Sequence, residues 1–371
     1  MPTATKPIAP RRLGRRLLGS PLLGALTTPH PVDRYLELVR PSWSLSEVRA
    51  KVVAAHRQTP GSVTLSLRPN AAWGGFRSGQ FVWVTVELDG VQRRRCYSLA
   101  GSELATDGRL ELTVREHPQG RVSRFLNRAA QPGMVLGLSQ AQGEFVLPSP
   151  RPERLLLISG GSGITPVISM LRTLCDEGHA APVTFLHYAR GERDLIYREQ
   201  LAALAASHPN VRLLRAYTRG DGGELAGHFN REHLLAAEPD YAASEAFVCG
   251  PTALIEAVGS HWAADGLVER LHVEHFVPPL RVSVPGDAGG RIRFARSGCE
   301  VTSDGASLLE QAERAGLRPE HGCRMGVCHS CVCRKLEGSV RNLRTGEISS
   351  EAHEQIQICI SAPVGDVELE L

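Results

Sequence analysis

The sequence predicts a multidomain protein with an antiparallel β-barrel, an α/β domain built on a parallel sheet, and a small α+β domain. Its 371 residues exceed what one hydrophobic core usually serves. Short alternating runs give way to long apolar runs with helical patterns between them, and three cysteines lie close together near the end. We therefore divide the chain into five segments: a leader with short helices (1–46), the barrel (47–150), the α/β domain (151–277), a linker (278–290) and the C-terminal domain (291–371).

The composition excludes several classes of protein. With 42% hydrophobic and 22% charged residues, the chain is globular and neither disordered nor fibrous. A net charge of +3 with no extended basic face gives no reason to expect nucleic-acid binding. Nine cysteines in so long a chain indicate a reducing compartment, so we expect a cytoplasmic protein. No apolar run reaches the roughly 18 residues that indicate a transmembrane helix.

The leader begins with a basic stretch. Residues 1–16 contain lysine and arginine but no acidic residue, and the apolar stretch 17–26 that follows is interrupted by glycine and proline. These interruptions and the lack of a clear cleavage site indicate a retained segment and not a secretory signal. We expect residues 1–26 to contact the inner, anionic face of a membrane weakly and reversibly. A tail that only keeps the protein soluble is the alternative.

Two motifs in the barrel segment have residue types that suit a flavin. Short alternating runs separated by turn residues predict the antiparallel strands. One run ends in Arg95, Tyr97 and Ser98, which can neutralise a phosphate, lie against a flat ring and hydrogen-bond a ring nitrogen. Taken alone, these residues would be better explained by an ordinary strand with an exposed arginine. However, Gly120 and Ser123 open a predicted helix further along, where backbone N–H groups can hold a phosphate.

The α/β segment carries the pattern of a dinucleotide-binding sheet. Five near-continuous apolar runs predict strands buried on both faces, with helices between them. The first run leads into "GGSGITP" (160–166) and then a helix, which is the arrangement of a pyrophosphate site. A glycine turn alone is weak evidence. The downstream "VCGP" (248–251) and "VEHF" (273–276) make the combination specific.

The cysteine cluster has the spacing of a plant-type [2Fe–2S] site. Cys323, Cys328 and Cys331 follow the pattern C-x4-C-x2-C, and Cys359 supplies a fourth thiolate further along the chain. Gly322 and Gly326 lie in the same loop and suit its tight curvature. A zinc site is the alternative, although it more often shows two separated C-x2-C pairs. With four ligands assigned, we expect Cys333 not to bind metal.

These motifs resemble two known families. Residues from about 48 to 277 resemble the ferredoxin–NAD(P)+ reductase superfamily. The stretches "GCRMGVCHSC" and "DGASLLEQAERAG" resemble plant-type ferredoxins, which implies a β-grasp fold for the C-terminal domain. His329 departs from the small residue usual in ferredoxins, which affects the expected hydrogen bonding to sulfur but not ligation.

The resemblance implies roles for individual residues. The flavin-binding residues would be Arg95, Tyr97, Ser98, Gly120 and Ser123. The nucleotide-binding residues would be Gly160, Gly161, Gly163, Thr165, Gly250 and Pro251. Cys249 would lie beside the nicotinamide, and Glu274 and Phe276 near the flavin edge. Ser98, Cys249 and Glu274 are thus the candidate catalytic residues. For Cys249, Glu274 and Phe276, plain sheet packing is the alternative.

Together the modules imply an oxidoreductase that moves electrons from NAD(P)H through a flavin to a [2Fe–2S] centre and on to a separate protein. We expect FAD, with FMN as the alternative. Thr218 and Arg219 follow an apolar run where the adenosine ribose should lie, so we expect NADPH, with NADH as the alternative.

The acceptor is less directly indicated. The leader resembles that of reductases serving membrane di-iron fatty-acyl desaturases, so a desaturase is the expected acceptor. An alkane, steroid or aromatic-ring oxygenase is the alternative. From a different class, the chain could be a non-enzymatic zinc-binding module.

Overall fold

The computed structural model describes residues 42–44, 46–118, 120–220, 222–276, 289–321, 326, 331–343 and 345–371. The predictions for the leader up to residue 41, and for most of the linker, lie outside these residues. The described chain forms two compact units: the first contains the described residues up to Gln92 and Cys96–Glu274, and the second contains Arg93–Arg95 and the described residues from His275 to Leu371. Within the described part, no helix is long and apolar enough to cross a lipid bilayer.

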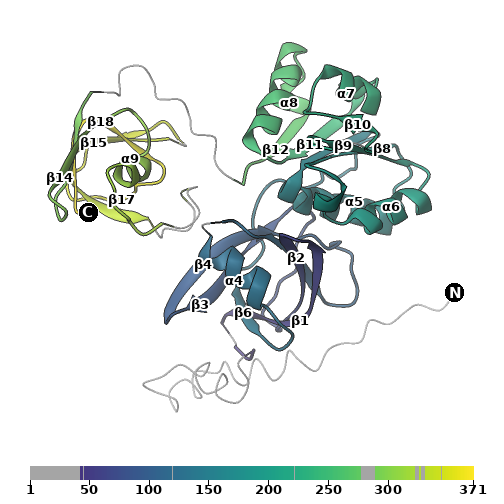
Figure 1. Cartoon of the computed structure of the whole chain (residues 1–371), viewed down its shortest axis with the longest axis horizontal. Helices are drawn as coiled ribbons and strands as arrows, with labels where there is room; N and C mark the ends of the chain where they lie inside the picture. Colours follow the sequence, from purple (N-terminus) through teal and green to yellow (C-terminus); the bar gives the residue numbers. More distant parts are fainter. Residues whose placement is uncertain are drawn as a thin grey trace. The chain divides into compact units, whose positions relative to one another are not determined.

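The flavin barrel is the first half of the first unit (Figure 1). Its sheet has the strand order β4-β3-β6-β1-β2-β5, and the pairs β1–β2, β1–β6, β2–β5 and β3–β6 are antiparallel. Leu110, Leu112 and Val114 alternate inward along β5, while Val122 and Leu126, four residues apart on α4, pack into the same core. The elements are β1 (Val48–Thr59), β2 (Ser62–Pro69), β3 (Phe81–Leu88), β4 (Val91–Ser98), β5 (Leu110–Arg115), α4 (Arg121–Ala129) and β6 (Val135–Leu138).

The nucleotide domain is the second half of the first unit. Its parallel sheet has the order β10-β9-β8-β7-β11-β12, so the direction of winding reverses between β7 and β11. Ligands of such sheets bind at this switch point, beyond the carboxyl ends of the strands. The strands are β7 (Leu155–Gly160), β8 (Val183–Ala189), β9 (Val211–Tyr217), β10 (Leu225–Ala226), β11 (Glu245–Cys249) and β12 (Leu271–Glu274). All five predicted apolar runs therefore form strands.

Helices cover both faces of this sheet (Figure 1). Leu234 of α7 and Trp262 of α8 pack against Leu156 and Ile158 of β7 on one face, and α5 and α6 lie on the other. Every residue of β7 and β8 is buried, which explains why these strands are near-continuous apolar runs in the sequence. The helices are α5 (Ile164–Asp176), α6 (Arg198–Ser207), α7 (Arg231–Ala237) and α8 (Thr252–Ala264).

The second unit has one helix against a mixed sheet, as expected for a β-grasp domain. The strand order is β14-β13-β18-β15-β16, with β17 paired to β15, and β13 and β18 are parallel. Leu308 and Ala312 on α9 pack with Ile292 and Phe294 of β13. The elements are β13 (Arg291–Phe294), β14 (Cys299–Thr302), α9 (Leu308–Arg314), β15 (Val332–Asn342), β16 (Ile348–Ser349), β17 (Gln355–Gln357) and β18 (Ser361–Leu369). The expected three-domain fold is confirmed.

Candidate functional site

The glycine turn after β7 lies against the end of β11. A Cβ atom added to Gly163 would come within 2.3 Å of the carbonyl oxygen of Cys249, so no larger residue fits there. Gly161 has a φ of 54°, a backbone conformation that glycine adopts without strain. Helix α5 begins directly after this turn, at Ile164. A bare backbone turn followed by a helix N-terminus fits the pyrophosphate of a dinucleotide.

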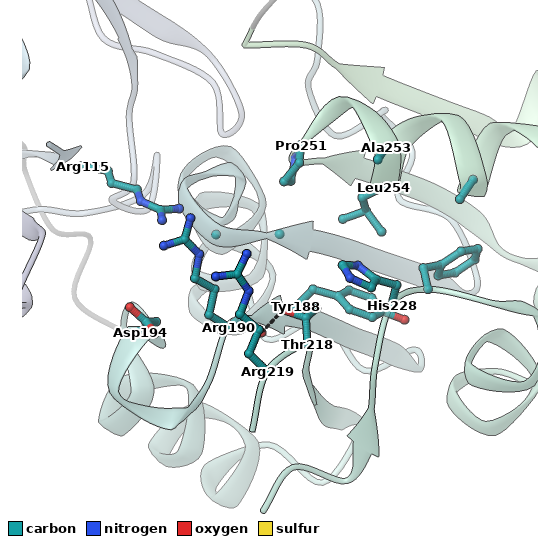
Figure 2. Close-up of a pocket in the computed structure, with 15 residues that line it drawn as sticks. Arg115, Tyr188, Arg190, Asp194, Thr218, Arg219, His228, Pro251, Ala253 and Leu254 are labelled. Carbon is teal, nitrogen blue, oxygen red and sulfur yellow. Dashed lines mark hydrogen bonds between the residues drawn. The ribbon is translucent and has the colours of Figure 1, made fainter. Parts of the chain in front are cut away.

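A cavity of about 360 Å³ opens at the switch point beside this turn (Figure 2). It is bordered by the ends of β7, β8 and β9 and by Pro251, which follows the end of β11. Five of the sequence-predicted nucleotide residues line it: Gly160, Gly161, Thr218, Arg219 and Pro251. Its other lining residues include Tyr188, Phe229 and Leu254, which make part of its wall apolar. The structure therefore brings the predicted nucleotide motifs together around one cavity.

Three arginines line this cavity, and the sequence indicated only one of them. Arg190 follows β8 and Arg219 follows β9, and the backbone N–H of Arg219 donates to the carbonyl of Arg190 at 2.8 Å. Arg115 is the last residue of β5 in the barrel, and its guanidinium is directed toward the glycine turn (Figure 2). Asp194 is the only acidic residue among those lining the cavity. Such a cluster of guanidinium groups favours a ligand with several phosphates.

The two predicted threonine hydroxyls are engaged with the protein backbone. Thr165 is buried and donates from its Oγ1 to the carbonyl of Ser162 at 3.0 Å. Thr218 donates in the same way to the carbonyl of Ala189 at 3.3 Å. Thr165 thus stabilises the glycine turn, and Thr218 ties the end of β9 to the end of β8.

Cys249 and Glu274 lie side by side at the carboxyl edge of the sheet. They are register partners in the parallel pair β11–β12, and Cys249 is also paired with Ser159 of β7. Burial raises the pKa of the Glu274 carboxyl to about 7. Burial, and to a lesser extent the Glu274 carboxylate, raise the pKa of the Cys249 thiol well above its usual range. Cys249 is therefore a neutral thiol at physiological pH.

The same row of the sheet continues with a buried serine and histidine. Ser159 is paired with His187 of β8, and Ser159 Oγ lies 2.8 Å from His187 Nδ1. Burial lowers the pKa of His187 to about 3, so the imidazole is neutral. Below neutral pH, where the Glu274 carboxyl is mostly protonated, the row Glu274–Cys249–Ser159–His187 is consequently polar with little net charge.

The predicted flavin residues lie on β4 and at the start of α4. Ser98 is buried at the end of β4, and Tyr97 packs partly buried against the barrel core. Arg95 is partly buried and donates from Nη1 to the carbonyl of Arg94 at 2.7 Å. Gly120 precedes α4, and Ser123 Oγ accepts from the backbone N–H of His117 at 3.1 Å and donates to the carbonyl of Gly120 at 3.2 Å.

The N-terminus of α4 suits a phosphate of the flavin. It has no side-chain cap and no acidic residue in its first turn, so no side chain of the helix start competes with a phosphate for the backbone N–H groups. Phe276 belongs to the second unit, so its predicted place near the flavin edge stays a prediction.

Two of the four predicted cluster ligands are described, and they lie close together. Cys331 and Cys359 are buried in one core cluster, and the N–H of Ile358 donates to the carbonyl of Cys331 at 3.2 Å. Gly326 has a φ of 69°, and a Cβ there would meet the Ile360 side chain at 2.4 Å, so the loop needs glycine at this point. Two buried cysteines in one core cluster, near a residue that requires glycine, fit an iron–sulfur site. Cys323, Cys328, Gly322 and His329 lie outside the described residues.

Comparisons with known proteins agree with this geometry. Three family models match: "Oxidoreductase FAD-binding domain" over residues 56–147, "Oxidoreductase NAD-binding domain" over 157–260, and "2Fe-2S iron-sulfur cluster binding domain" over 292–364. An NADPH oxidoreductase of Mycobacterium tuberculosis is 38% identical over 352 residues, which cover 93% of this chain and 90% of the relative. The glycine betaine monooxygenase reductase subunit of Pseudomonas aeruginosa is 31% identical, covering 80% and 87%.

A solved structure shares the fold. Phthalate dioxygenase reductase superposes with a TM-score of 0.56 at 22% identity, covering 87% of this chain and 97% of that one.

The cofactors follow from these matches. The chain uses FAD, a [2Fe–2S] cluster and NAD(P)H, and it is an NAD(P)H-dependent flavin and iron–sulfur oxidoreductase. Bound FAD supplies the chemistry that converts a two-electron donor into a source of single electrons for the cluster. The chain belongs to the ferredoxin–NAD(P)+ reductase family of flavoproteins, among the members that carry a C-terminal [2Fe–2S] ferredoxin domain.

Proposed function

We propose that this chain is the reductase component of a multicomponent oxygenase and delivers electrons from NADPH to a separate oxygenase protein. The observation that carries the proposal is the order of modules in one chain: flavin barrel, nucleotide cavity and cysteine-bearing domain. The glycine betaine monooxygenase reductase subunit has similar sequence over most of its length. The desaturase expected from the leader has no support among these relatives. The membrane contact of residues 1–26 and the cytoplasmic location stay predictions.

Different residues around the cavity would bind different parts of the nucleotide. The turn Gly160–Gly163 and the start of α5 would hold the pyrophosphate through backbone N–H groups, and Arg115 supplies a positive charge from the barrel side. Arg190 and Arg219 follow neighbouring strands and suit the 2′-phosphate of NADPH. On the flavin side, Tyr97 and Ser98 would contact the ring system, and the α4 N-terminus would hold a phosphate.

Cys249 and Glu274 suit the nicotinamide end of the site. The Cys249 thiol is neutral and fully buried, so it would keep this edge of the sheet uncharged beneath a nicotinamide ring. Glu274 changes charge near neutral pH, so it can take up or release a proton at this edge of the sheet.

The acceptor can be identified by reconstitution. The purified holoprotein, with NADPH, should support substrate oxidation by an oxygenase component encoded in the same genome, measured as product formed per NADPH consumed. A membrane desaturase from that genome serves as the parallel acceptor. Turnover with the desaturase and none with any oxygenase would contradict the proposal.

We expect NADPH to be preferred because of the arginine pair. Arg219→Ala and Arg190→Ala should each lower kcat/KM for NADPH about 10- to 100-fold, the range for losing a hydrogen bond to a charged group, and leave kcat/KM for NADH nearly unchanged. Arg198→Ala is the matched control, because Arg198 is an exposed arginine on α6 paired with Glu192 at 3.1 Å. An NADH preference in the unmodified protein would refute the assignment.

The four cluster ligands can be tested one at a time. Replacing Cys323, Cys328, Cys331 or Cys359 with serine should abolish or strongly reduce cluster content, measured as iron and acid-labile sulfide per chain. Cys333→Ser is the matched control: the Cys333 thiol donates to the carbonyl of Arg334 at 3.7 Å, and burial raises its pKa to about 11. Full cluster occupancy in Cys359→Ser would remove that residue from the ligand set.

The raised pKa of Glu274 predicts a pH-dependent stability difference. Its pKa in the folded protein is about 7, against an ordinary value of 4.5. The folded state therefore favours the protonated carboxyl, and wild-type stability falls as the pH rises from about 4.5 through 7. Glu274→Gln cannot ionise, so its Tm relative to wild type should be higher at pH 8 than at pH 5 by scanning calorimetry. The same Tm difference at both pH values would show that the carboxyl is not perturbed.

A further inference from the structure

Tyr197 reaches from the nucleotide domain to the flavin barrel with an unusual backbone. It precedes α6 with φ 61° and ψ 27°, a left-handed conformation that is rare for a bulky residue. Its backbone N–H donates to Oε1 of Gln58 on β1 at 3.2 Å, and its carbonyl accepts from Leu201 at 2.8 Å. The side chain is 1% exposed. Such a conformation persists only where the surrounding contacts hold it in place.

The Tyr197 hydroxyl joins two strands of the barrel. It is hydrogen-bonded to Oγ1 of Thr113 on β5, and Thr113 Oγ1 lies 2.6 Å from Oγ1 of Thr64 on β2. Thr64 and Thr113 face one another in the antiparallel register, and all three hydroxyls are buried. Burial raises the pKa of the Tyr197 phenol, so it stays protonated across the physiological range. A chain of three hydroxyls thus crosses from the nucleotide domain into the barrel.

Arg172 of α5 completes this contact. Its guanidinium carbon lies 4.7 Å from the centroid of the Tyr197 ring, within the range of a cation–π interaction. Nη1 of the same side chain donates to Oε2 of Glu111 at 2.7 Å and to the carbonyl of Ala100 at 2.6 Å. Ala100 comes two residues after Ser98, the last residue of the flavin motif.

The same helix holds the rest of the segment that follows the flavin motif. Ser169 Oγ donates to the carbonyl of Gly101 at 2.6 Å, and the N–H of Glu103 donates to Thr173 Oγ1 at 3.1 Å. At its other end, α5 begins at the glycine turn of the nucleotide cavity. One 13-residue helix therefore contacts both the pyrophosphate turn and the segment directly after Ser98.

We propose that Tyr197 is a positioning residue for hydride transfer: together with Arg172 it fixes α5 on the barrel, so that nicotinamide and flavin meet at a set separation. Hydride transfer needs its reacting atoms about 3–3.5 Å apart, and a displacement of about 1 Å can cost about 100-fold in rate. Tyr197 lies outside the residues that line the nucleotide cavity, so it acts on the rate through the placement of α5.

The test is rapid mixing of the FAD-loaded protein with NADPH, followed at the flavin absorbance. Tyr197→Phe keeps the ring but removes the hydroxyl, and it should lower the limiting rate of FAD reduction about tenfold while changing the Kd for NADP+ by less than about twofold. Thr113→Val should have the same effect, and the double variant should be no slower than either single one. Thr113→Ser, which retains the hydroxyl, should react at the wild-type rate.

The control separates positioning from general stability. Tyr241→Phe removes a phenol hydroxyl that is hydrogen-bonded to Asp265 within the nucleotide domain, so it should lower Tm without slowing FAD reduction. Hydrogen exchange gives a readout independent of turnover, since amides of residues 100–103 should exchange faster in Tyr197→Phe than in Tyr241→Phe.

Wild-type rates in Tyr197→Phe, or equal slowing in Tyr241→Phe, would overturn the proposal. If Tyr197→Phe does not fold, the Thr113→Val and Thr113→Ser pair decides: equal rates in the two variants would overturn it as well.

Discussion

The rest of the site depends on the close packing of the glycine turn after β7 against the carbonyl of Cys249. Because Gly163 has no side chain, the turn and the start of α5 can lie directly at the end of β11. This contact closes the switch point of the sheet on one side and leaves the cavity on the other. A side chain at residue 163 would push α5 outward, and with it every contact that the helix makes with the barrel.

Charge is distributed unevenly around the site in a way that matches a dinucleotide. Arg115, Arg190 and Arg219 lie around the part of the cavity that would receive the phosphates. The row at the carboxyl edge is different, because burial keeps Cys249 and His187 neutral. Buried charges without partners are costly, so a neutral edge allows an uncharged ring to be enclosed without water. The sheet thus has a positively charged cavity at one place and a row of buried polar side chains at another, which is the division that the proposed function requires.

Sequence patterns predicted those parts of the structure that depend on local chain order. Strands such as β7 and β8, buried on both faces, are near-continuous apolar runs, and the glycine turn marks where the first one ends. The iron–sulfur domain was recognisable because the spacing of thiols along the chain is itself the signal, and the family match over residues 292–364 confirms that domain. Arg190 directly follows an apolar run, but the sequence does not show that the ends of β8 and β9 lie side by side and so bring Arg190 next to Arg219.

Arg115 and Tyr197 could not have been found in the same way. Each lies in one half of the first unit and acts on the other half, a relation that only the folded chain creates. Polar residues at the end of a strand or before a helix are common, and nothing in the sequence distinguishes these two. The acceptor is a different case, since the expectation of a desaturase came from a leader that lies largely outside the described residues.

Helix α5 contacts the barrel and begins at the glycine turn of the nucleotide cavity, whereas the ends of β8 and β9 line the cavity. This difference matters for protein engineering and for divergence within the family. Arg190 and Arg219 follow β8 and β9, whose strand neighbours belong to the nucleotide sheet alone. If the proposed role of this arginine pair holds, coenzyme choice can be redesigned by exchanging short loops at these two strand ends. Substitutions on the inward face of α5 are more restricted. Ser169, Arg172 and Thr173 form hydrogen bonds with the barrel, and the start of the helix lies at the predicted pyrophosphate turn. Libraries aimed at new coenzymes should accordingly vary the loops and leave the helix constant.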